Sequence, residues 1–248
     1  ARQYLPDCYR RLTNVFSDNH AFPKLLHKTY GYRPELFRVL KSPVDASFSV
    51  PAVRKPQGRK VLWAGRLDRQ KRPDLLLAVA QALPDVEFHV YGDAMLDYKT
   101  GVVDSLRQLK NVRMKGGFDG VESLPFTEFP VFFYTSQWDG TPTMVIAAAL
   151  ASIPIVASRV GGVGDIVTEE RGYPVAEIEN VALYVDRIEE ALDSPAQAEA
   201  KAAAAREYVK SEHSDLAFAQ ALAAVPGYMS PLADAQQGSS GGVESCVV

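Results

Sequence analysis

Short apolar runs alternate with stretches of helical periodicity through the middle of this 248-residue chain. Nearly continuous apolar runs that end at glycine or a polar residue are typical of strands buried on both faces of a parallel sheet. The pattern predicts strands at Lys60–Gly65, Val86–Gly92, Asn111–Lys115, Pro130–Thr135 and Ile153–Ser158. It predicts helices at Arg72–Leu83, Val102–Lys110, Thr143–Ser152, Val181–Leu192, Ala196–Val209 and Asp215–Val225.

Strand and helix follow each other in turn from residue 59 to residue 194, and that order predicts the fold class. Successive parallel strands are joined by right-handed crossovers, so helices cover both faces of the sheet. We therefore expect an α/β fold with a doubly wound, Rossmann-like parallel sheet and extra C-terminal helices. In this prediction the domain covers residues 59–230.

The two ends of the chain differ from the middle. In residues 1–46, apolar segments at Asn14–Ser17 and Phe37–Asp45 flank a predicted helix near His20–Tyr30, which is typical of the last units of a preceding domain. Residues 47–58 are rich in proline and charge and are interpreted as a linker. Residues 231–248 are small and polar, so a disordered tail is predicted. Because the chain starts at Ala1, we expect an N-terminal domain upstream.

Composition and charge exclude several function classes. The chain has 27 Lys and Arg residues against 30 Asp and Glu residues, so it lacks the cation surplus that nucleic-acid binding needs. Its two cysteines, Cys8 and Cys246, lie near opposite ends, which excludes a disulfide framework and a cysteine zinc site. No apolar run reaches the ~18–20 residues of a membrane span. The expected location is the cytoplasm, or the inner face of a membrane as a peripheral protein.

The loop after the first predicted strand carries candidate anion-binding residues. It reads Gly-Arg-Leu-Asp-Arg-Gln-Lys-Arg-Pro from Gly65 onward and enters a helix, whose N-terminus offers N–H groups and partial positive charge. The guanidinium of Arg66 can bind two phosphate oxygens, and the ammonium of Lys71 adds a point charge. The alternative is a solvated basic turn, which is the usual role of a charge run. Arg69 and Arg72 are interpreted as surface residues.

The loop after the fourth predicted strand is a second candidate. Asp139 can accept hydrogen bonds from sugar hydroxyls, and Gly140 permits close approach of a ligand. The N–H groups of Thr143–Val145, at a helix start, are expected to face a diphosphate or a sugar hydroxyl. The alternative makes Asp139 or Thr141 an ordinary helix N-cap. A third glycine-rich turn, Val160–Asp165, is a weak signal by itself.

Together these pieces resemble a known family. A Gly-Arg-Leu turn with a lysine follows the first strand, Tyr-Gly-Asp ends the second, and Asn-Val-Arg-Met-Lys-Gly-Gly ends the third. Ser-Gln-Trp-Asp-Gly-Thr-Pro then precedes Ile-Pro-Ile-Val-Ala-Ser-Arg-Val-Gly-Gly-Val. Over residues 59–222 this order resembles glycosyltransferase family 4, and more narrowly the C-terminal, donor-nucleotide domain of these retaining enzymes of GT-B fold. The joint order is more specific than any single motif.

The resemblance implies roles for individual residues. The family positions that hold the donor diphosphate match Gly65, Arg66 and Lys71. The positions that line the nucleobase pocket match Gly117 and Phe118. The turn and helix start that meet the sugar and the phosphates match Gly140, Thr141, Thr143, Met144 and Val145. Catalytic roles are implied for Arg66, Lys71 and Asp139. The family has two paired glutamates, and Asp139 stands at the position of the first, with a side chain one methylene shorter.

The function that the resemblance implies is sugar transfer. A hexose-type sugar would pass from a UDP- or GDP-sugar to a glycan or lipid-linked acceptor, with the acceptor held mainly by the missing N-terminal domain. The isolated chain is therefore expected to turn over poorly. No metal or other cofactor is expected, because Arg66 and Lys71 take the place of magnesium at the diphosphate. This interpretation would fail if these two side chains were splayed away from the cleft or plugged by the protein's own carboxylates.

Ala147 departs from the family pattern. It stands at the second glutamate, which in the family bonds the ribose hydroxyls, and losing that bond weakens donor binding by ~1.5–3 kcal/mol unless a neighbour substitutes. An alternative hypothesis is therefore a catalytically degenerate nucleotide-sugar-binding or scaffold domain. A Rossmann-type oxidoreductase ranks lower, because the chain lacks a Gly-x-Gly-x-x-Gly turn after a first strand. Trp63 and Trp138 are interpreted as packing residues at strand ends.

Overall fold

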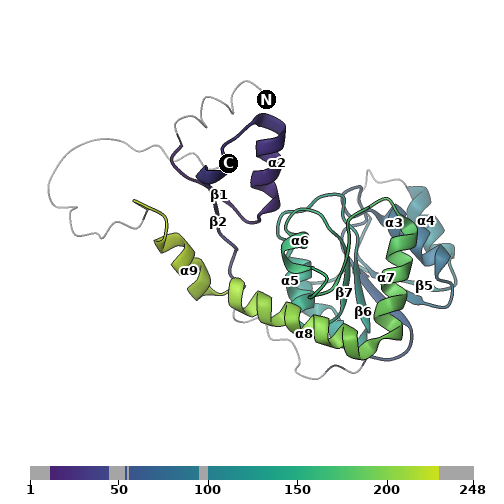
Figure 1. Ribbon diagram of the computed structural model, residues 1–248. Helices are drawn as coiled ribbons and strands as arrows, with labels where there is room; N and C mark the ends of the chain where they lie inside the picture. Colours follow the sequence, from purple (N-terminus) through teal and green to yellow (C-terminus); the bar gives the residue numbers. More distant parts are fainter. Residues whose placement is uncertain (1–11, 45–53, 55, 95–99, 229–248) are drawn as a thin grey trace.

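The computed structural model describes residues 12–44, 54, 56–94 and 100–228 and confirms the predicted α/β fold (Figure 1). The strands are β1 (Val15–Ser17), β2 (Phe37–Val39), β3 (Lys60–Ala64), β4 (Glu87–Tyr91), β5 (Val112–Gly116), β6 (Val131–Tyr134), β7 (Ile155–Ser158) and β8 (Tyr173–Val175). The helices are α2 (Ala21–Tyr30), α3 (Pro73–Ala82), α4 (Thr100–Gln108), α5 (Thr143–Leu150), α6 (Val163–Ile166), α7 (Val181–Asp193), α8 (Pro195–Glu212) and α9 (Asp215–Ala223). Short 3-10 helices cover Pro34–Leu36, Val121–Ser123 and Phe126–Glu128.

The main sheet has six parallel strands and is buried on both faces. Successive side chains of a strand point to opposite faces. In β3, Val61 and Trp63 join the core cluster formed with α3, α4 and α7, whereas Leu62 and Ala64 join the cluster formed with α5, α6 and α8. Figure 1 shows α3, α4 and α7 on one side of the sheet and α5 and α6 on the other. Burial on both faces explains why the strand sequences are almost entirely apolar.

The strand order, β5-β4-β3-β6-β7-β8, fixes where a ligand can bind. The chain builds β3, β4 and β5 outward in one direction, and then β6, β7 and β8 outward in the other. Between β3 and β6 the order reverses, and ligands of open α/β sheets bind at such a point, beyond the carboxyl ends of the strands. The loops that follow β3 and β6 therefore share one edge of the sheet.

The predicted strands and helices are confirmed with small shifts at their ends, but β8, α6 and the short 3-10 helices were not predicted. The edge strand β8 is only three residues long and contains Pro174, so its sequence lacks a strand pattern. Proline removes a backbone donor, which an edge strand tolerates because one side of it is unpaired. Helix α6 is a single turn that begins within the glycine-rich segment Val160–Asp165 and ends at Ile166.

Arg72 is a structural residue, so the prediction that it lies on the surface is wrong. Its backbone has φ 54°, and α3 begins at the next residue, Pro73. Only 14% of its side chain is exposed, and it forms ion pairs with Glu179 (2.7 Å) and Asp74 (2.9 Å). Hydrogen bonding to Glu179, and then to Asp74, raises the pKa of Arg72. Arg69 is exposed, as predicted.

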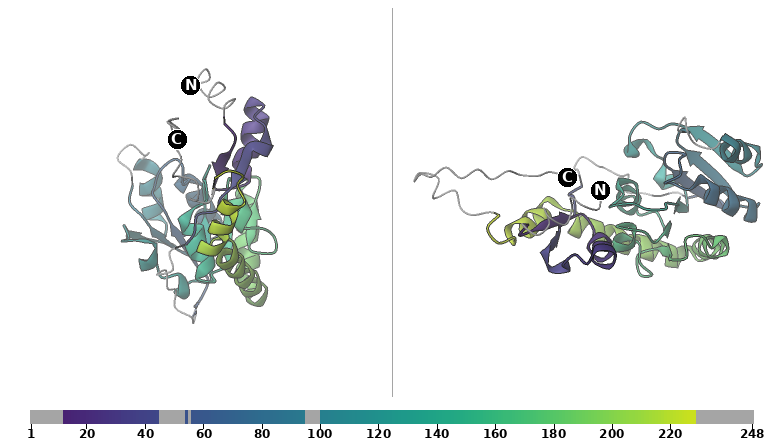
Figure 2. Two further views of the ribbon diagram at one scale, coloured as in Figure 1. Left: turned by 90° about the vertical axis from the view of Figure 1, so that its left-hand side faces the viewer. Right: turned by 90° about the horizontal axis from the view of Figure 1, so that it is seen from above.

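Residues 12–44 form a small unit of their own, in which β1 and β2 pair in parallel and α2 lies between them in sequence. The C-terminal helices return to this unit, and both Figure 1 and Figure 2 show α9 beside it. The rings of Phe16 and Tyr228 meet at 5.4 Å, and the Val44 N–H donates to the His213 carbonyl at 2.8 Å. The first and last segments of the described chain are thus in contact.

Two predicted segments fall largely outside the described residues. These are the linker at 47–58, of which only residues 54 and 56–58 are described, and the tail at 231–248. The domain boundaries drawn through them stay predictions. Within the described part of the chain, no helix has both the length and the apolarity that crossing a bilayer requires.

Candidate functional site

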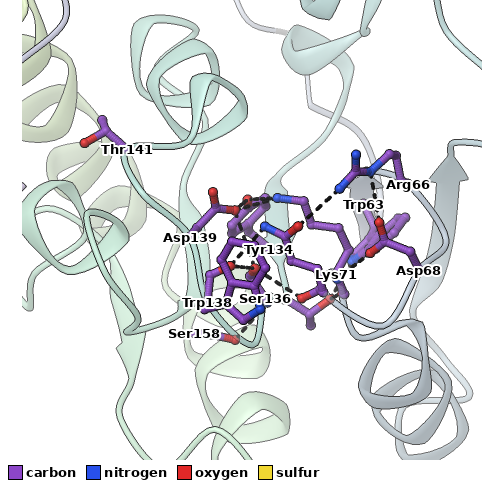
Figure 3. A network of polar contacts seen from close by, with 12 residues as sticks. Trp63, Arg66, Asp68, Lys71, Tyr134, Ser136, Trp138, Asp139, Thr141 and Ser158 are labelled. Carbon is purple, nitrogen blue, oxygen red and sulfur yellow. Dashed lines mark hydrogen bonds and ion pairs between the residues drawn. The ribbon is translucent and has the colours of Figure 1, made fainter. Parts of the chain in front are cut away.

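The loops after β3 and β6 are fastened to each other where the strand order reverses. The Gln137 N–H donates to the Gln70 carbonyl at 2.8 Å, and Thr135 Oγ1 donates to the Lys71 carbonyl at 2.6 Å. Trp63 is buried, as predicted, and its Nε1–H supports Thr135 Oγ1 at 2.8 Å. The two loops therefore form one edge on which side chains of both meet (Figure 3).

Lys71, Tyr134 and Asp139 form the centre of the site. Lys71 Nζ lies 2.5 Å from Asp139 Oδ2 and 2.6 Å from the hydroxyl oxygen of Tyr134. The Tyr134 hydroxyl donates to the same Asp139 oxygen at 2.5 Å. The Lys71 ammonium also lies over the Tyr134 ring, 5.0 Å from its centroid. Each of the three groups thus contacts the other two.

The network is shielded but still reachable from solvent. The side chains of Lys71 and Asp139 are 16% and 15% exposed, whereas the Tyr134 ring is packed in the core. Burial, and then the charge of Asp139, raises the pKa of the Tyr134 hydroxyl. The phenol therefore stays protonated at neutral pH and acts as a donor to the carboxylate. Partial burial strengthens the ion pair relative to one on the open surface.

Arg66 lies at the solvent side of the same edge (Figure 3). Its side chain is 59% exposed, and its Nε lies 2.9 Å from Asp68 Oδ2. A second guanidinium nitrogen donates to Gln70 Oε1 at 3.1 Å. The guanidinium is thus held by its own loop but remains accessible to a ligand.

Both cations have a carboxylate partner within the described chain, Asp139 for Lys71 and Asp68 for Arg66. The expectation that the protein's own carboxylates leave this pair of cations unneutralised is therefore wrong. Asp68 was not singled out from the sequence, although a carboxylate between two cations in a short loop is a usable signal. Its Oδ1 also accepts the Lys71 N–H at 2.9 Å, which tightens the turn. A diphosphate would have to share these cations with the carboxylates.

The turn at Gly140 and Thr141 is held by the N-terminal unit. Thr141 N–H donates to Asp18 Oδ2 at 2.8 Å, and Thr141 Oγ1 donates to the Asp18 carbonyl at 2.9 Å. A Cβ on Gly140 would stand 2.6 Å from that carboxylate oxygen, so glycine permits the approach. Thr141 accordingly points away from the Lys71 network (Figure 3). Asp18 was not predicted, because its partner lies far along the chain.

The start of α5 rules out one interpretation of its sequence and limits the other. The helix is capped at Pro142, and no side chain bonds to the cap, so neither Asp139 nor Thr141 is its N-cap. The Val145 N–H donates to the Pro142 carbonyl at 3.0 Å and is not available to a ligand. Thr143 is exposed and Met144 is half-buried at the helix start.

The glycine-rich turn after β7 is part of the site, although its sequence signal was weak. The Gly162 N–H donates to the Gly140 carbonyl at 2.8 Å. Gly161 has φ 47°, and a Cβ there would stand 1.7 Å from the Asp139 carbonyl oxygen. The backbone of the turn therefore packs directly on the backbone that carries Asp139, and only glycine fits.

A cleft of about 700 Å³ opens beside Asp139 and Gly140. One wall comes from the N-terminal unit, with Phe22 and Leu25 of α2, and the other includes Trp138. Trp138 is 63% exposed, so the prediction that it is a packing residue is wrong. Neither Arg66 nor Lys71 lines this cleft.

The remaining predicted residues lie around this edge without joining the network. Gly65 follows β3 and packs against the Lys71 side chain, and Gly117 approaches the Asp93 carboxylate after β5. Phe118 is partly buried against the core cluster that contains α5. Ala147 is 2% exposed within that cluster and presents only a methyl group.

Comparison with known proteins identifies the family. The family model described as glycosyl transferases group 1 matches residues 48–210, which is more than half of the chain. The chain belongs to the group 1 glycosyl transferases. This membership agrees with the resemblance seen in the sequence at the level of the superfamily.

Curated relatives of this group 1 chain are glycosyltransferases and a spore protein. The O-antigen biosynthesis glycosyltransferase WbnH of Escherichia coli is 27% identical over 150 residues, which cover 58% of this chain and 43% of that protein. Spore coat protein SA of Bacillus subtilis is 31% identical over 155 residues, covering 55% of this chain and 40% of that protein. The chain thus spans less than half the length of these relatives.

Solved structures share the fold of this group 1 chain. Anabaena Alr3699/HepE in complex with UDP has a TM-score of 0.75 at 19% identity, covering 87% of this chain and 64% of that one. A mutant of S. aureus TarM in complex with fondaparinux, alpha-GlcNAc-glycerol and UDP has a TM-score of 0.73 at 20% identity. The match covers 89% of this chain and 45% of that one. At such identities the likeness concerns the fold alone.

Proposed function

We propose that this chain is the donor-nucleotide half of a retaining glycosyltransferase of family 4. In this proposal it takes a hexose-type sugar from a UDP- or GDP-sugar and delivers it to a glycan or lipid-linked acceptor, in the cytoplasm or at the inner face of a membrane. The observation that carries the proposal is the Lys71–Asp139 pair at the reversal of the sheet order, with Arg66 on the same edge. Group 1 membership supports it.

Charge is the physical basis of the proposed reaction. Breaking the sugar–phosphate bond places negative charge on the departing nucleoside diphosphate, and fixed cations in a partly dehydrated site stabilise that charge. Arg66 offers a planar guanidinium at the solvent side of the edge, and Lys71 offers an ammonium group that is less exposed. Asp139 is suited to accept hydrogen bonds from hydroxyls of the sugar. The proposal assigns the diphosphate to these side chains without a metal ion.

Lys71 can serve this role although Asp139 neutralises it. An ammonium group has three N–H donors, and the bonds to Tyr134 and Asp139 use two of them. One donor is left for a phosphate oxygen. For Arg66, a diphosphate would compete with Asp68. The Arg66 side of that ion pair is 59% exposed, so solvent weakens the pair.

Nucleotide titration tests the proposal. We expect UDP or GDP to bind the purified chain with millimolar or tighter affinity by calorimetry, and Arg66→Ala to weaken that binding at least about ten-fold, because a charged hydrogen-bonding group is lost. Arg69→Ala, at an exposed arginine of the same loop, is the matched control and should leave affinity unchanged. EDTA should leave it unchanged as well.

Two results would contradict this proposal. Absence of binding to UDP, GDP and ADP alike would count heavily against a donor site. Equal losses in Arg66→Ala and Arg69→Ala would show that only general charge matters.

Ala147 favours a second candidate, a degenerate nucleotide-sugar-binding or scaffold domain. Its buried methyl group offers no hydrogen bond to a ribose. Ala147→Glu in the full-length protein discriminates the two candidates. If the wild type is inactive and the variant gains a large activity, the degenerate domain is favoured. If the wild type turns over normally, the degenerate domain is ruled out. Because the site is buried, the variant's unfolding midpoint must be measured beside its activity, since a misfolded variant would also be inactive.

A further inference from the structure

The hydroxyl of Tyr134 connects two side chains that come from different loops. Tyr134 ends β6, and its ring lies 6.0 Å from the ring of Phe132 in the core, where it is 1% exposed. Its hydroxyl alone reaches the polar edge. Because the ring is fixed by the core, the position of the hydroxyl is fixed as well.

The polar contacts of Asp139 fall on one oxygen. Lys71 Nζ and the Tyr134 hydroxyl both bond to Oδ2 at 2.5 Å, and Ser136 Oγ is 3.5 Å from that same atom. A phenol can accept one hydrogen bond and donate another at the same time. Tyr134 does both, because it accepts from Lys71 and donates to Asp139.

We propose that Tyr134 is a positioning residue of the donor site: it locks Lys71 onto Oδ2 of Asp139, so that Oδ1 and the third Lys71 N–H are presented to the nucleotide sugar. This inference rests on the proposed function. Tyr134 adds a second hydrogen bond to the Asp139 oxygen that pairs with Lys71. Because the phenol ring is held in the core, this bond fixes the orientation of the carboxylate.

Tyr134→Phe tests this role by removing only the oxygen. Tyr173→Phe is the matched control, because Tyr173 is also buried and its hydroxyl has no hydrogen-bond partner among the described residues. The probe is whichever of UDP-glucose and GDP-glucose binds the wild-type chain. We expect Tyr134→Phe to weaken its binding about ten-fold and Tyr173→Phe to leave it unchanged.

A double-mutant cycle separates positioning from a general packing defect. In an Asp139→Ala background, Tyr134→Phe should cost little further affinity, because the acceptor group that Tyr134 positions has been removed. An equal loss in both backgrounds would overturn the inference, and so would equal losses in Tyr134→Phe and Tyr173→Phe.

A measurement without nucleotide keeps the inference separate from the proposed function. Acetylation of Lys71 by a succinimidyl ester, followed by mass spectrometry, should be several-fold faster in Tyr134→Phe than in the wild type or Tyr173→Phe, because the ammonium loses one of its two anchors. Unchanged labelling would overturn the inference. If the wild-type chain binds no nucleotide sugar, the proposed function fails, and the labelling rates alone decide whether Tyr134 holds Lys71.

Discussion

Asp139 contacts the other residues of the site through both its side chain and its backbone. Its carboxylate holds Lys71 and the Tyr134 hydroxyl, while its carbonyl faces the backbone of Gly161. The carboxylate lies 15% exposed beside the cleft. A change that moves this backbone should therefore disturb the ion pair, even though no charged atom is altered.

Gly161→Ala tests whether moving the Asp139 backbone disturbs the ion pair. A methyl group would stand 1.7 Å from the Asp139 carbonyl, and φ 47° is unfavourable for alanine. We expect the free energy of unfolding to fall by at least about 1–2 kcal/mol and nucleotide binding to weaken. Urea unfolding and calorimetry measure the two effects.

Gly101→Ala is its control, because Gly101 sits in α4 and, beyond its chain neighbours and the backbone of its own helix, no described atom lies within 4 Å of the added methyl group. Alanine there should preserve or slightly raise stability. If both alanine variants behaved alike, the close packing of the glycine turn on Asp139 would have no energetic consequence.

At the scale of elements, the C-terminal end of α8 is joined to the segment that follows β2. His213 caps α8, is buried, and its Nδ1 lies 3.0 Å from the Ser42 carbonyl. Lys41 and Glu212 form an ion pair beside it at 2.6 Å. This junction links the N-terminal unit to the long helix of the sheet domain.

Stability of this junction should depend on pH. Burial lowers the pKa of His213 below its ordinary value, although the bond to Ser42 opposes the shift. The folded protein therefore favours the neutral imidazole, so its contribution is present above the ordinary histidine pKa of about 6.5 and is lost as pH falls through the folded value. Urea unfolding of the wild type should show lower stability at pH 5.5 than at pH 7.5.

His213→Gln should reduce that difference, because glutamine does not titrate. His27→Gln, at an exposed histidine, is the matched control and should keep the wild-type difference. An unchanged pH dependence in His213→Gln would assign the effect to other groups.

At the scale of the whole molecule, two units meet at the site. Asp18 bonds Thr141, and the His20 N–H donates to Asp165 Oδ2 at 2.9 Å, so the N-terminal unit contacts the loops after both β6 and β7. The cleft has walls from both units and is lined by Asp18 itself. Its shape therefore depends on how the two units are held together.

Local sequence signals determined most of the fold. Apolar runs and helical periodicity depend on neighbouring residues, and they located β3 to β7 and the long helices to within a few residues. They did not predict β8, since a three-residue edge strand with proline is too short to show a repeating pattern of apolar and polar residues. They also failed at Arg72, because its partner Glu179 lies 107 residues away.

Only the tertiary structure decided how the site is assembled. The sequence supplied Lys71 and Asp139 as candidates, but their pairing follows from β3 lying next to β6, which long-range packing of the sheet selects. Tyr134 was concealed in an apolar run because its ring belongs to the core and only its oxygen belongs to the site. Asp18 was concealed because its partner comes from a distant loop. Residue chemistry is local and can be recognised in sequence, whereas adjacency across the sheet exists only after the chain has folded.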